Sequence, residues 1–456
     1  MPAERRAGHR FRLDLMENIM KIRGALIAGS VLSLASGTAA ASGFGVSYQS
    51  VSAMGTAYAG SAVLSEDATN QWYNPATLAG LNTAEVSIAA HQVWIDTTFK
   101  ANGASGPGDF EDVEPFVGSA FLALPFNDRV TFGLGINAPY GTKIEYEDNW
   151  GNANGGPSSA FFPTTGDPYA QTSDVQTINI NPAVGIQITD NLRLGAGVNY
   201  QQIDADIENA ATRLEGDDDA FGWNAGLTFN PDESNHFGVA YRSEISYDID
   251  GDITFKEPAV AATAAAGGAT GPVLDAIVND LAGKYSGKTS LDLPAVLQLS
   301  YAGDLTDRTQ LLLGVEHTYW SSLDRLVVEH DGTEPSLGGA ALPNPSVEEF
   351  DWEDTTRYSV GLRHTLPSDT VLRFGLAKEE STQSSDNRSA ISPDSDRVWA
   401  TIGAGFKPAD NLSIDVAYAH IFVDDADVYK DSRGAVLDGT YELDANVIGA
   451  QLNYQF

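Results

Sequence analysis

The last nine residues of the chain, 448–456, read IGAQLNYQF and alternate between apolar and polar side chains. In an extended strand such alternation puts the two kinds of side chain on opposite faces. One face would carry Ile448, Ala450, Leu452, Tyr454 and Phe456, and the other would carry Gly449, Gln451, Asn453 and Gln455. A soluble sheet would bury the apolar face under a second layer. In an outer-membrane barrel that face contacts lipid, and the polar face lines the lumen.

The same alternation recurs upstream, at 412–418, 372–376 and 192–200. Within these segments Arg373 and Asp415 each lie between apolar neighbours. A charged side chain that faces lipid at the membrane midplane costs up to about 2–4 kcal/mol, so both residues are expected to face a hydrated interior. The pattern therefore predicts an all-β protein, an antiparallel transmembrane β-barrel.

Short turn signals alternate with long loops, and they set the number of strands. The short turns are 127–129, 189–191, 230–235, 304–307, 367–369 and 408–410. Six short periplasmic turns between strand pairs, together with the terminal strands, give about fourteen strands. The expected strands are 84–97, 113–126, 130–139, 175–188, 191–206, 219–229, 236–254, 289–303, 308–320, 352–366, 370–380, 395–407, 411–424 and 440–456.

The composition excludes several kinds of protein. The 456 residues include no cysteine, which rules out disulfides and cysteine-based metal sites. With 26 basic and 62 acidic residues the formal net charge is −36, which disfavours nucleic acid as a partner because phosphates need a basic surface. The acidic runs 145–148, 217–219 and 424–427 are interpreted as solvated loops. The alternative is that divalent cations bridge them to lipopolysaccharide.

Residues 20–41 have the layout of a secretory signal peptide. A basic MKIR at 20–23 precedes an apolar stretch at 24–34 and the small residues 39–41. We expect cleavage after Ala41 and assign 1–41 to an N-terminal extension and signal peptide, with Met20 as a candidate start. Beyond this segment no run approaches the roughly 20 apolar residues that a spanning helix needs. The exported chain is therefore not expected to cross a membrane as helices.

Residues 42–82, called the hatch below, precede the first clear strand. They are rich in Gly, Ala and Ser and show neither helical nor strand periodicity. Asn74-Pro75-Ala76, preceded by Trp72 and Tyr73, marks a turn. Taken alone the segment is a compact coil. Ahead of a large barrel it has few places to go except inside, so we expect it to plug a barrel formed by 83–456.

Short motifs in the hatch and the barrel have the order and spacing of a known family. They are Gly43-Phe44, 57–60, Asn74-Pro75-Ala76, 216–226, 291–294, 319–320, 352–355 and 386–397. Together they resemble the FadL family of outer-membrane channels for long-chain fatty acids and other hydrophobic compounds. The resemblance implies a plugged barrel in outer-membrane lipid, with Phe44, Trp72, Asn74, Pro75 and Ala76 as hatch residues. The terminal Phe456 also resembles the recognition signal of the barrel assembly machinery.

Two outer loops have the composition expected of a docking surface for apolar substrates. Loop 138–174 contains Trp150, Phe161 and Phe162 among Gly and Ser. Loop 256–288 is rich in Ala, and Pro272 and Gly283 bracket a predicted helix over 272–281. One face of this helix carries Val273, Leu274, Ile277, Val278 and Leu281. Either this face packs on other loops and does nothing more, or it forms the acyl-chain groove that the family resemblance implies.

Glycine and proline weaken the third predicted strand, which reads TFGLGINAPY over 131–140. Gly133, Gly135 and Pro139 lie in it, and Pro182 lies in the fourth strand beside it. Proline removes a ladder donor, and glycine marks kinks and close backbone approaches. The family resemblance implies that substrate leaves sideways through a gap here. Ordinary barrel-corner glycines are the rival interpretation.

A fatty-acid carboxylate would need a basic partner on the inner wall. Strand parity makes Arg193, Arg242, Arg363 and Arg373 the candidates. An uncharged hydrocarbon would need none of them.

The sequence offers no sign of catalysis. Its seven histidines are scattered without metal-ligand spacing, and no Gly-x-Ser-x-Gly elbow occurs. We expect no enzyme activity, no cofactor and no metal site. The predicted function is passive transport of long-chain fatty acids. The alternatives are a channel of the same fold for aromatic or alkane hydrocarbons, and a structural or adhesive barrel.

Overall fold

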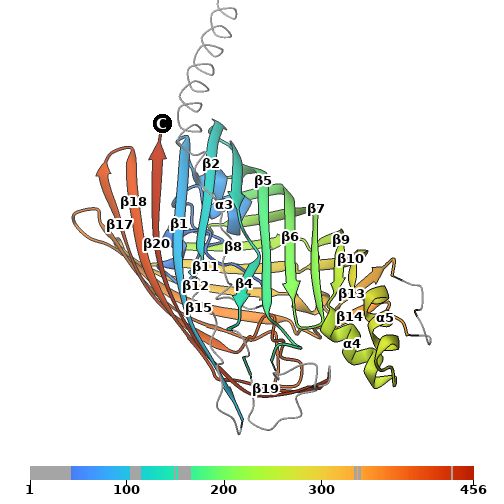
Figure 1. The fold of residues 1–456 in the computed structure, drawn as a ribbon. Helices are drawn as coiled ribbons and strands as arrows, with labels where there is room; N and C mark the ends of the chain where they lie inside the picture. The colour runs from blue at the N-terminus through green and yellow to red at the C-terminus, as the bar shows by residue number, and fades with distance from the viewer. Residues whose placement is uncertain are drawn as a thin grey trace, which may run out of the picture. The chain divides into compact units, whose positions relative to one another are not determined.

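The computed structural model describes residues 43–102, 114–147, 150–151, 166–332, 336, 340–432 and 435–456. In this part of the chain a single antiparallel sheet closes on itself (Figure 1). Closure occurs where β20 (Ala435–Gln455) pairs with β18 (Leu412–Val423) on one side and with β1 (Glu85–Ala101) on the other. The result is the predicted fourteen-stranded barrel.

Ten of the wall strands are continuous. They are β1, β2 (Phe116–Asn127), β5 (Thr172–Thr189), β6 (Leu192–Glu208), β7 (Thr212–Phe229), β12 (Thr309–Thr318), β15 (Thr355–Thr365), β16 (Val371–Glu379), β17 (Arg397–Ala409) and β20. The other four are each interrupted once. They are β3 (Val130–Asn137) with β4 (Gly141–Glu145), β8 (Asn235–Arg242) with β9 (Ile245–Phe255), β10 (Gly283–Leu293) with β11 (Val296–Thr306), and β18 with β19 (Ala426–Ser432).

Each predicted strand overlaps one wall strand, but the interruptions were not predicted. Two of them have a direct chemical cause, because Pro139 and Pro294 have no N–H to give to a ladder. The hairpin of β13 (Arg325–His330) and β14 (Ser346–Glu349) was also missed. It joins the wall only where β13 meets β10 at Gly287 and Lys288, and it extends one outer loop.

Burial confirms the two-faced strands. On β20 the side chains of Ile448 and Leu452 are 52% and 40% exposed, whereas Gln451 is 2% exposed. Arg373 and Asp415, the charges predicted to face the interior, are both buried there. No second layer covers the exposed apolar side chains of the strands in the described structure, so they form the surface that contacts lipid.

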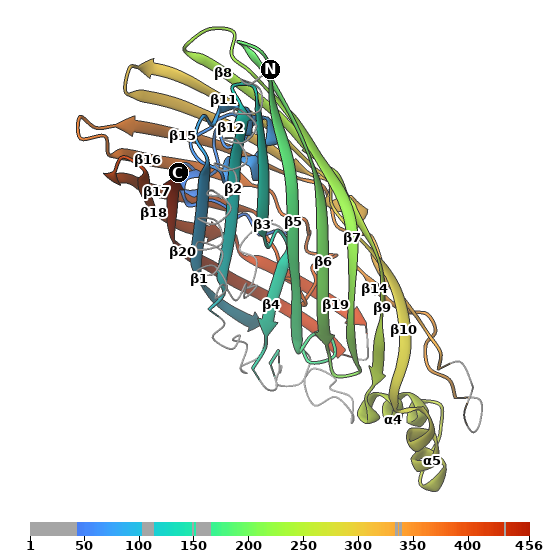
Figure 2. The ribbon, with the colours of Figure 1, turned by 90° about the horizontal axis from the view of Figure 1, so that it is seen from above.

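Six short helical elements complete the described structure. The hatch contains α2 (Val51–Met54), α3 (Asn70–Tyr73) and the 3-10 helix η1 (Pro75–Gly80). The outer loops hold α4 (Glu257–Ala266), η2 (Trp320–Ser322) and α5 (Pro272–Leu281), and α5 has the predicted bounds. Figure 2 shows α4 and α5 together at the ends of β9 and β10. None of these helices has the length and apolar character needed to cross a bilayer.

Candidate functional site

The hatch lies within the barrel and contacts its wall on several sides. Helix α2 packs on β1, β17, β18 and β20, while η1 packs on β3, β5, β6 and β7. The prediction of an irregular coil missed its helical turns, which local caps stabilise. Ser50 Oγ accepts a hydrogen bond from Ala53 N and starts α2, and Asn74 Oδ1 accepts one from Ala76 N and starts η1.

Glycines on the inner wall allow the hatch backbone to approach it. A Cβ atom at Gly195 would lie 2.2 Å from Ala76 N, and one at Gly238 would lie 2.2 Å from Ala62 O. At Gly375 it would lie 2.2 Å from the carbonyl carbon of Thr56. Any side chain at these positions would collide with main chain, which cannot move aside as a flexible side chain can. The glycines therefore fix how closely the hatch fits.

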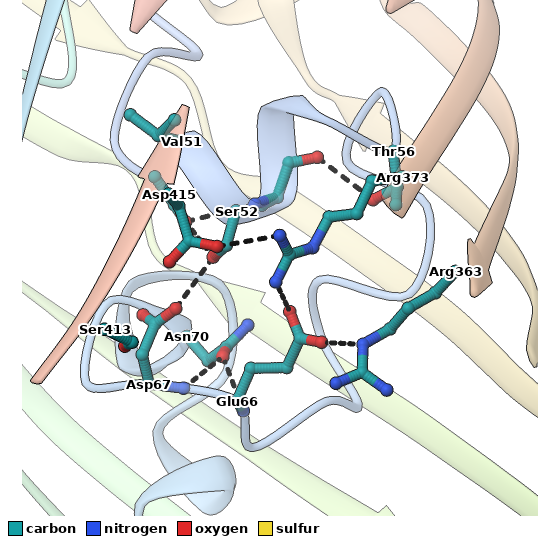
Figure 3. Close-up of polar contacts among 12 residues, drawn as sticks. Val51, Ser52, Thr56, Glu66, Asp67, Asn70, Arg363, Arg373, Ser413 and Asp415 are labelled. Atoms are coloured by element: carbon teal, nitrogen blue, oxygen red, sulfur yellow. Dashed lines mark hydrogen bonds and ion pairs between the residues drawn. The ribbon is translucent and has the colours of Figure 1, made fainter. Parts of the chain in front are cut away.

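One side of the hatch is held by ion pairs that are buried or partly buried (Figure 3). Glu66 pairs with Arg363 of β15 and with Arg373 of β16, whose Nη2 is 3.3 Å from Glu66 Oε2. Arg373 Nη1 also lies 2.7 Å from Asp415 Oδ1 on β18. Burial alone would raise the pKa of Glu66, but the two guanidinium groups outweigh it and hold that pKa below its ordinary value. Two candidate carboxylate partners, Arg363 and Arg373, are thus already neutralised by the protein.

Asn74 holds the opposite side of the hatch. Its Nδ2 donates to the carbonyl oxygens of Ala62, at 2.7 Å, and of Leu227 on β7, at 3.0 Å. Pro75 follows as the first residue of η1, where its missing N–H costs nothing. The predicted Asn-Pro turn is therefore a helix cap that also joins the hatch to the wall.

Arg242, at the end of β8, is buried against Trp72 of the hatch. Its guanidinium carbon lies 3.5 Å from the centre of the Trp72 ring, and the group donates to Trp72 O and to Asn199 Oδ1. Within the described residues no carboxylate lies within the 4.0 Å of an ion pair with Arg242. By contrast Arg193 lies toward a short turn, where it is only partly buried and donates to Gln187.

Arg357 of β15 is a lumen residue that the sequence analysis did not select. It shares strand parity with Arg363, so the signal was present. It forms an ion pair of 2.8 Å with Glu316, donates to Ser47 Oγ at 2.8 Å, and lies over the Tyr58 ring. Its charge is therefore compensated by the wall.

Three hollows follow one another from the outer loops to the hatch. A groove of about 850 Å³ is lined by α4, α5 and the hairpin of β13 and β14. A cavity of about 70 Å³, called the apolar cavity below, shares Leu214, Leu326 and Val328 with the groove and is also lined by Phe44. A cavity of about 80 Å³, called the hatch cavity below, is lined by Trp72, Tyr73, Pro139, Tyr140, Arg242 and Arg357, among others.

The predicted docking residues have different positions. Ile277 and Leu281 line the groove. Leu274 and Val278 are partly buried beside it, and Val273 is 50% exposed. Trp150 is fully buried, because it stacks on Tyr146 at 3.8 Å and donates from Nε1 to Ala170 O. Phe161 and Phe162 lie outside the described residues.

The barrel wall is interrupted between β2 and the third strand. β3 ends at Asn137, and β4 pairs with β5, while residues 116–119 of β2 pair with β1; no pairing across the break is seen among the described residues. On the lumen side the N-terminal residues of the hatch take this place. Val46 N donates to Pro139 O, and Gly141 N donates to Phe44 O, both at 2.8 Å.

The four residues predicted for a lateral exit do not all border this break. Gly133 and Gly135 remain paired with both β2 and β5. Pro182 is exposed on the lipid side, and it interrupts the ladder between β5 and β6, where Asn181 Nδ2 donates to Val198 O instead. Pro139 lies in the break itself.

Residues 32–456 match the family described as outer membrane protein transport protein (OMPP1/FadL/TodX). Outer membrane protein P1 of Haemophilus influenzae is 26% identical, over 96% of this chain and 100% of that protein. The long-chain fatty acid transport protein of Escherichia coli K12 is 24% identical, over 93% and 97%.

Two crystal structures have a similar fold. That of a Pseudomonas aeruginosa FadL homologue has a TM-score of 0.76 at 23% identity, covering 91% of this chain and 100% of that one. That of the Ralstonia pickettii toluene transporter TbuX has a TM-score of 0.59 at 17% identity, covering 90% and 99%.

Proposed function

Because the chain belongs to the OMPP1/FadL/TodX family of outer-membrane transport proteins, we propose that it admits long-chain fatty acids by passive diffusion. The curated relatives include long-chain fatty acid transport proteins, and one similar crystal structure is a toluene transporter. Both kinds of protein transport hydrophobic compounds. The choice of substrate depends on the chemistry of the cavities.

The outer groove is where an acyl chain would first leave water. Ile277 and Leu281 present buried apolar surface to it, next to Val260 of α4. Burial of each methylene gains about 0.8 kcal/mol, so a groove of about 850 Å³ would favour a long chain over a short one. From there the chain would enter the apolar cavity beside Phe44.

The observation that carries the choice of fatty acid is that Arg242 forms no direct ion pair among the described residues, although the carboxylate of Glu316 lines the same cavity and acts on its charge at longer range. Arg242 lines the hatch cavity, is 9% exposed, and has no carboxylate at ion-pair distance within the described residues. A buried cation without a direct ion pair is costly, and a substrate carboxylate would supply that pair. Arg357, Arg363 and Arg373 already pair with carboxylates of the protein and do not require one from a substrate.

For the exit we propose the break beside Pro139. In this proposal the hatch closes the direct route along the barrel axis, and the close approach of its backbone to wall glycines on several strands supports that role. Pro139 lines the hatch cavity and lies where β2 and the third strand separate. A substrate that leaves there would enter lipid directly instead of periplasmic water.

An aromatic hydrocarbon is the second candidate. The hatch cavity is rich in rings, with Trp72, Tyr73, Tyr140 and Trp320 in its lining. A small uncharged ring could be held by such faces and would not need Arg242.

Uptake of radiolabelled oleate and toluene would test the proposal, in cells that lack their own channel and express this chain or its Arg242→Gln variant. We expect wild-type cells to accumulate oleate, and the variant to bind oleate about 10- to 100-fold more weakly, the effect of losing a charged hydrogen bond. The matched control is Arg193→Gln, which should not change oleate affinity. Toluene uptake alone, unaffected by Arg242→Gln, would favour the second candidate. Entry of neither compound by a correctly inserted barrel would contradict transport and favour a structural role.

A further inference from the structure

Tyr140 lies between the two inner cavities. Of the residues that line the apolar cavity and the hatch cavity, it is the one that both linings share, within the part of the chain that the structure describes. It follows Pro139 in the break of the wall and is 7% exposed. Tyr140 therefore borders the space between the two cavities.

The backbone of Tyr140 is firmly held. Its N–H donates to Thr177 Oγ1 at 3.0 Å, and the same hydroxyl donates to Tyr140 O at 2.6 Å. On the other side residue 140 forms a bridge with Gly45 of the hatch. The Thr177 hydroxyl and the hatch thus replace the ladder that Pro139 interrupts, and they leave the peptide little freedom.

The side chain, in contrast, has one polar tether. Its hydroxyl donates to Pro294 O at 3.0 Å. Pro294 lies in the interruption between β10 and β11, outside both ladders, so its carbonyl is available to the tyrosine. Trp320 contacts the ring edge-on with 6.0 Å between ring centres. Movement of the ring requires loss of a single hydrogen bond, whereas movement of the backbone would require loss of several.

We propose that the Tyr140 side chain is a gate between the apolar cavity and the hatch cavity, closed by its hydrogen bond to Pro294 O. The proposal rests on the proposed function, because it presumes that a substrate moves along these cavities. In this proposal Tyr140 controls how fast a substrate passes between the cavities and does not determine how tightly the substrate binds. The proposal requires that the groups that bind substrate at either end, such as Arg242, keep their positions when the gate opens.

A gate makes a kinetic prediction that a binding residue does not. Loss of the tether lowers the barrier in both directions and leaves the two end states alone, so association and dissociation rates should rise by the same factor. For one hydrogen bond that factor is about 2- to 13-fold. The equilibrium dissociation constant should stay the same.

The test is stopped-flow binding of cis-parinaric acid to the purified full-length barrel, followed by energy transfer from tryptophan. Tyr140→Phe removes only the hydroxyl, and Tyr140→Leu also replaces the ring with a smaller aliphatic side chain. Tyr247→Phe is the matched control. It removes another buried hydroxyl of the same apolar cluster, one bonded to Gln201 at 2.8 Å, from a residue outside the linings of these cavities. Heat-modifiable migration in gels verifies that each variant is a folded barrel.

The expected result is faster association and dissociation for Tyr140→Phe, still faster rates for Tyr140→Leu, and wild-type rates for Tyr247→Phe. Unchanged rates in both Tyr140 variants would overturn the gate, and so would a changed dissociation constant with only one rate altered. A wild-type barrel that binds neither parinaric acid nor toluene would instead contradict the proposed function, and the gate with it.

Discussion

The two ends of the lumen are built on opposite principles. Toward the short turns the inner wall carries glycines such as Gly195, Gly238 and Gly375, and hatch backbone packs directly on them. Toward the long loops the wall carries large side chains, including Ile253, Leu293 and Tyr441, and these pack on one another. The first end is filled by hatch backbone, and the second by side chains of the wall together with those of the outer loops and Phe44.

The difference explains where space remains. A backbone that touches a glycine-lined wall leaves little room beside it, and polar anchors at Glu66 and Asn74 fix it further. Large side chains on a wide curved wall cannot meet at the centre everywhere, so cavities persist there. The proposed substrate path follows those cavities as far as the hatch and then turns toward the break at Pro139. Each experiment below acts on one end, and the first two use the other end as their control.

The largest effect is expected from a side chain added where hatch and wall touch. In Gly195→Ala the new Cβ would be 2.2 Å from Ala76 N, so hatch or strand must shift. We expect the hatch to loosen and the barrel to conduct ions, measured as single-channel conductance in planar bilayers. Gly287→Ala at the long-loop end is the control, because its Cβ meets the side chain of Val328 at 3.2 Å. Equal conductance in both variants would show that the two ends do not differ in this respect.

A smaller effect should follow from loss of the Glu66 ion pairs. Glu66→Gln leaves Arg363 without its partner and Arg373 with Asp415 alone, and removal of one member of a buried pair costs about 3–5 kcal/mol. Protection of residues 43–81 in hydrogen exchange should fall accordingly. The control Lys100→Gln breaks the exposed pair with Glu442 near a long loop, where the expected cost is about 0–1 kcal/mol. Unchanged protection in Glu66→Gln would mean that glycine contacts alone hold the hatch.

A modest effect is expected in the outer groove. Leu281→Ala removes apolar surface from its lining, and loss of contact with about one methylene should raise the oleate concentration for half-maximal uptake about 4-fold. Val273→Ala, at a half-exposed position at the start of α5 outside the groove lining, should not change it. If both variants behaved alike, the groove would be excluded as the first site for the acyl chain.

The same Glu66 ion pairs also make the hatch sensitive to pH. Because the pKa of Glu66 is depressed in the folded protein, its ion pairs stabilise the hatch fully above the ordinary glutamate pKa of about 4.3. That stabilisation is lost as pH falls through the depressed value. Hydrogen exchange of the hatch in wild type and Glu66→Gln should therefore differ at pH 7 and converge in strong acid. A difference that persisted or grew in acid would contradict this assignment.

The local pattern of the sequence was enough to predict the strands. The alternation of apolar and polar side chains is visible in neighbours such as Gly449, Ala450 and Gln451. Because one face of each strand contacts lipid, a charged side chain on that face is costly. The bounds of α5 followed equally locally, from Pro272 at its start and the apolar positions along one face. Both predictions depend on interactions within one element or with a uniform solvent.

The roles of the individual arginines were beyond the reach of that pattern. Parity selected Arg193, Arg242, Arg363 and Arg373 equally, since it reports only which face a side chain occupies. Glu66, more than 290 residues upstream in the chain, neutralises two of them. No spacing in the sequence predicts these ion pairs between the hatch and the wall.

The sequence by itself determined the alternation, the number of strands and the membrane-facing band, because these depend on each residue's preference for lipid or water. The tertiary structure alone decided that Arg363 and Arg373 have direct ion pairs while Arg242 has none among the described residues, where Trp150 is buried, and that Tyr140 borders two cavities. Those features arise when the barrel closes and brings distant strands and the hatch within a few ångströms, where charge and volume must be balanced against partners that the local sequence does not contain.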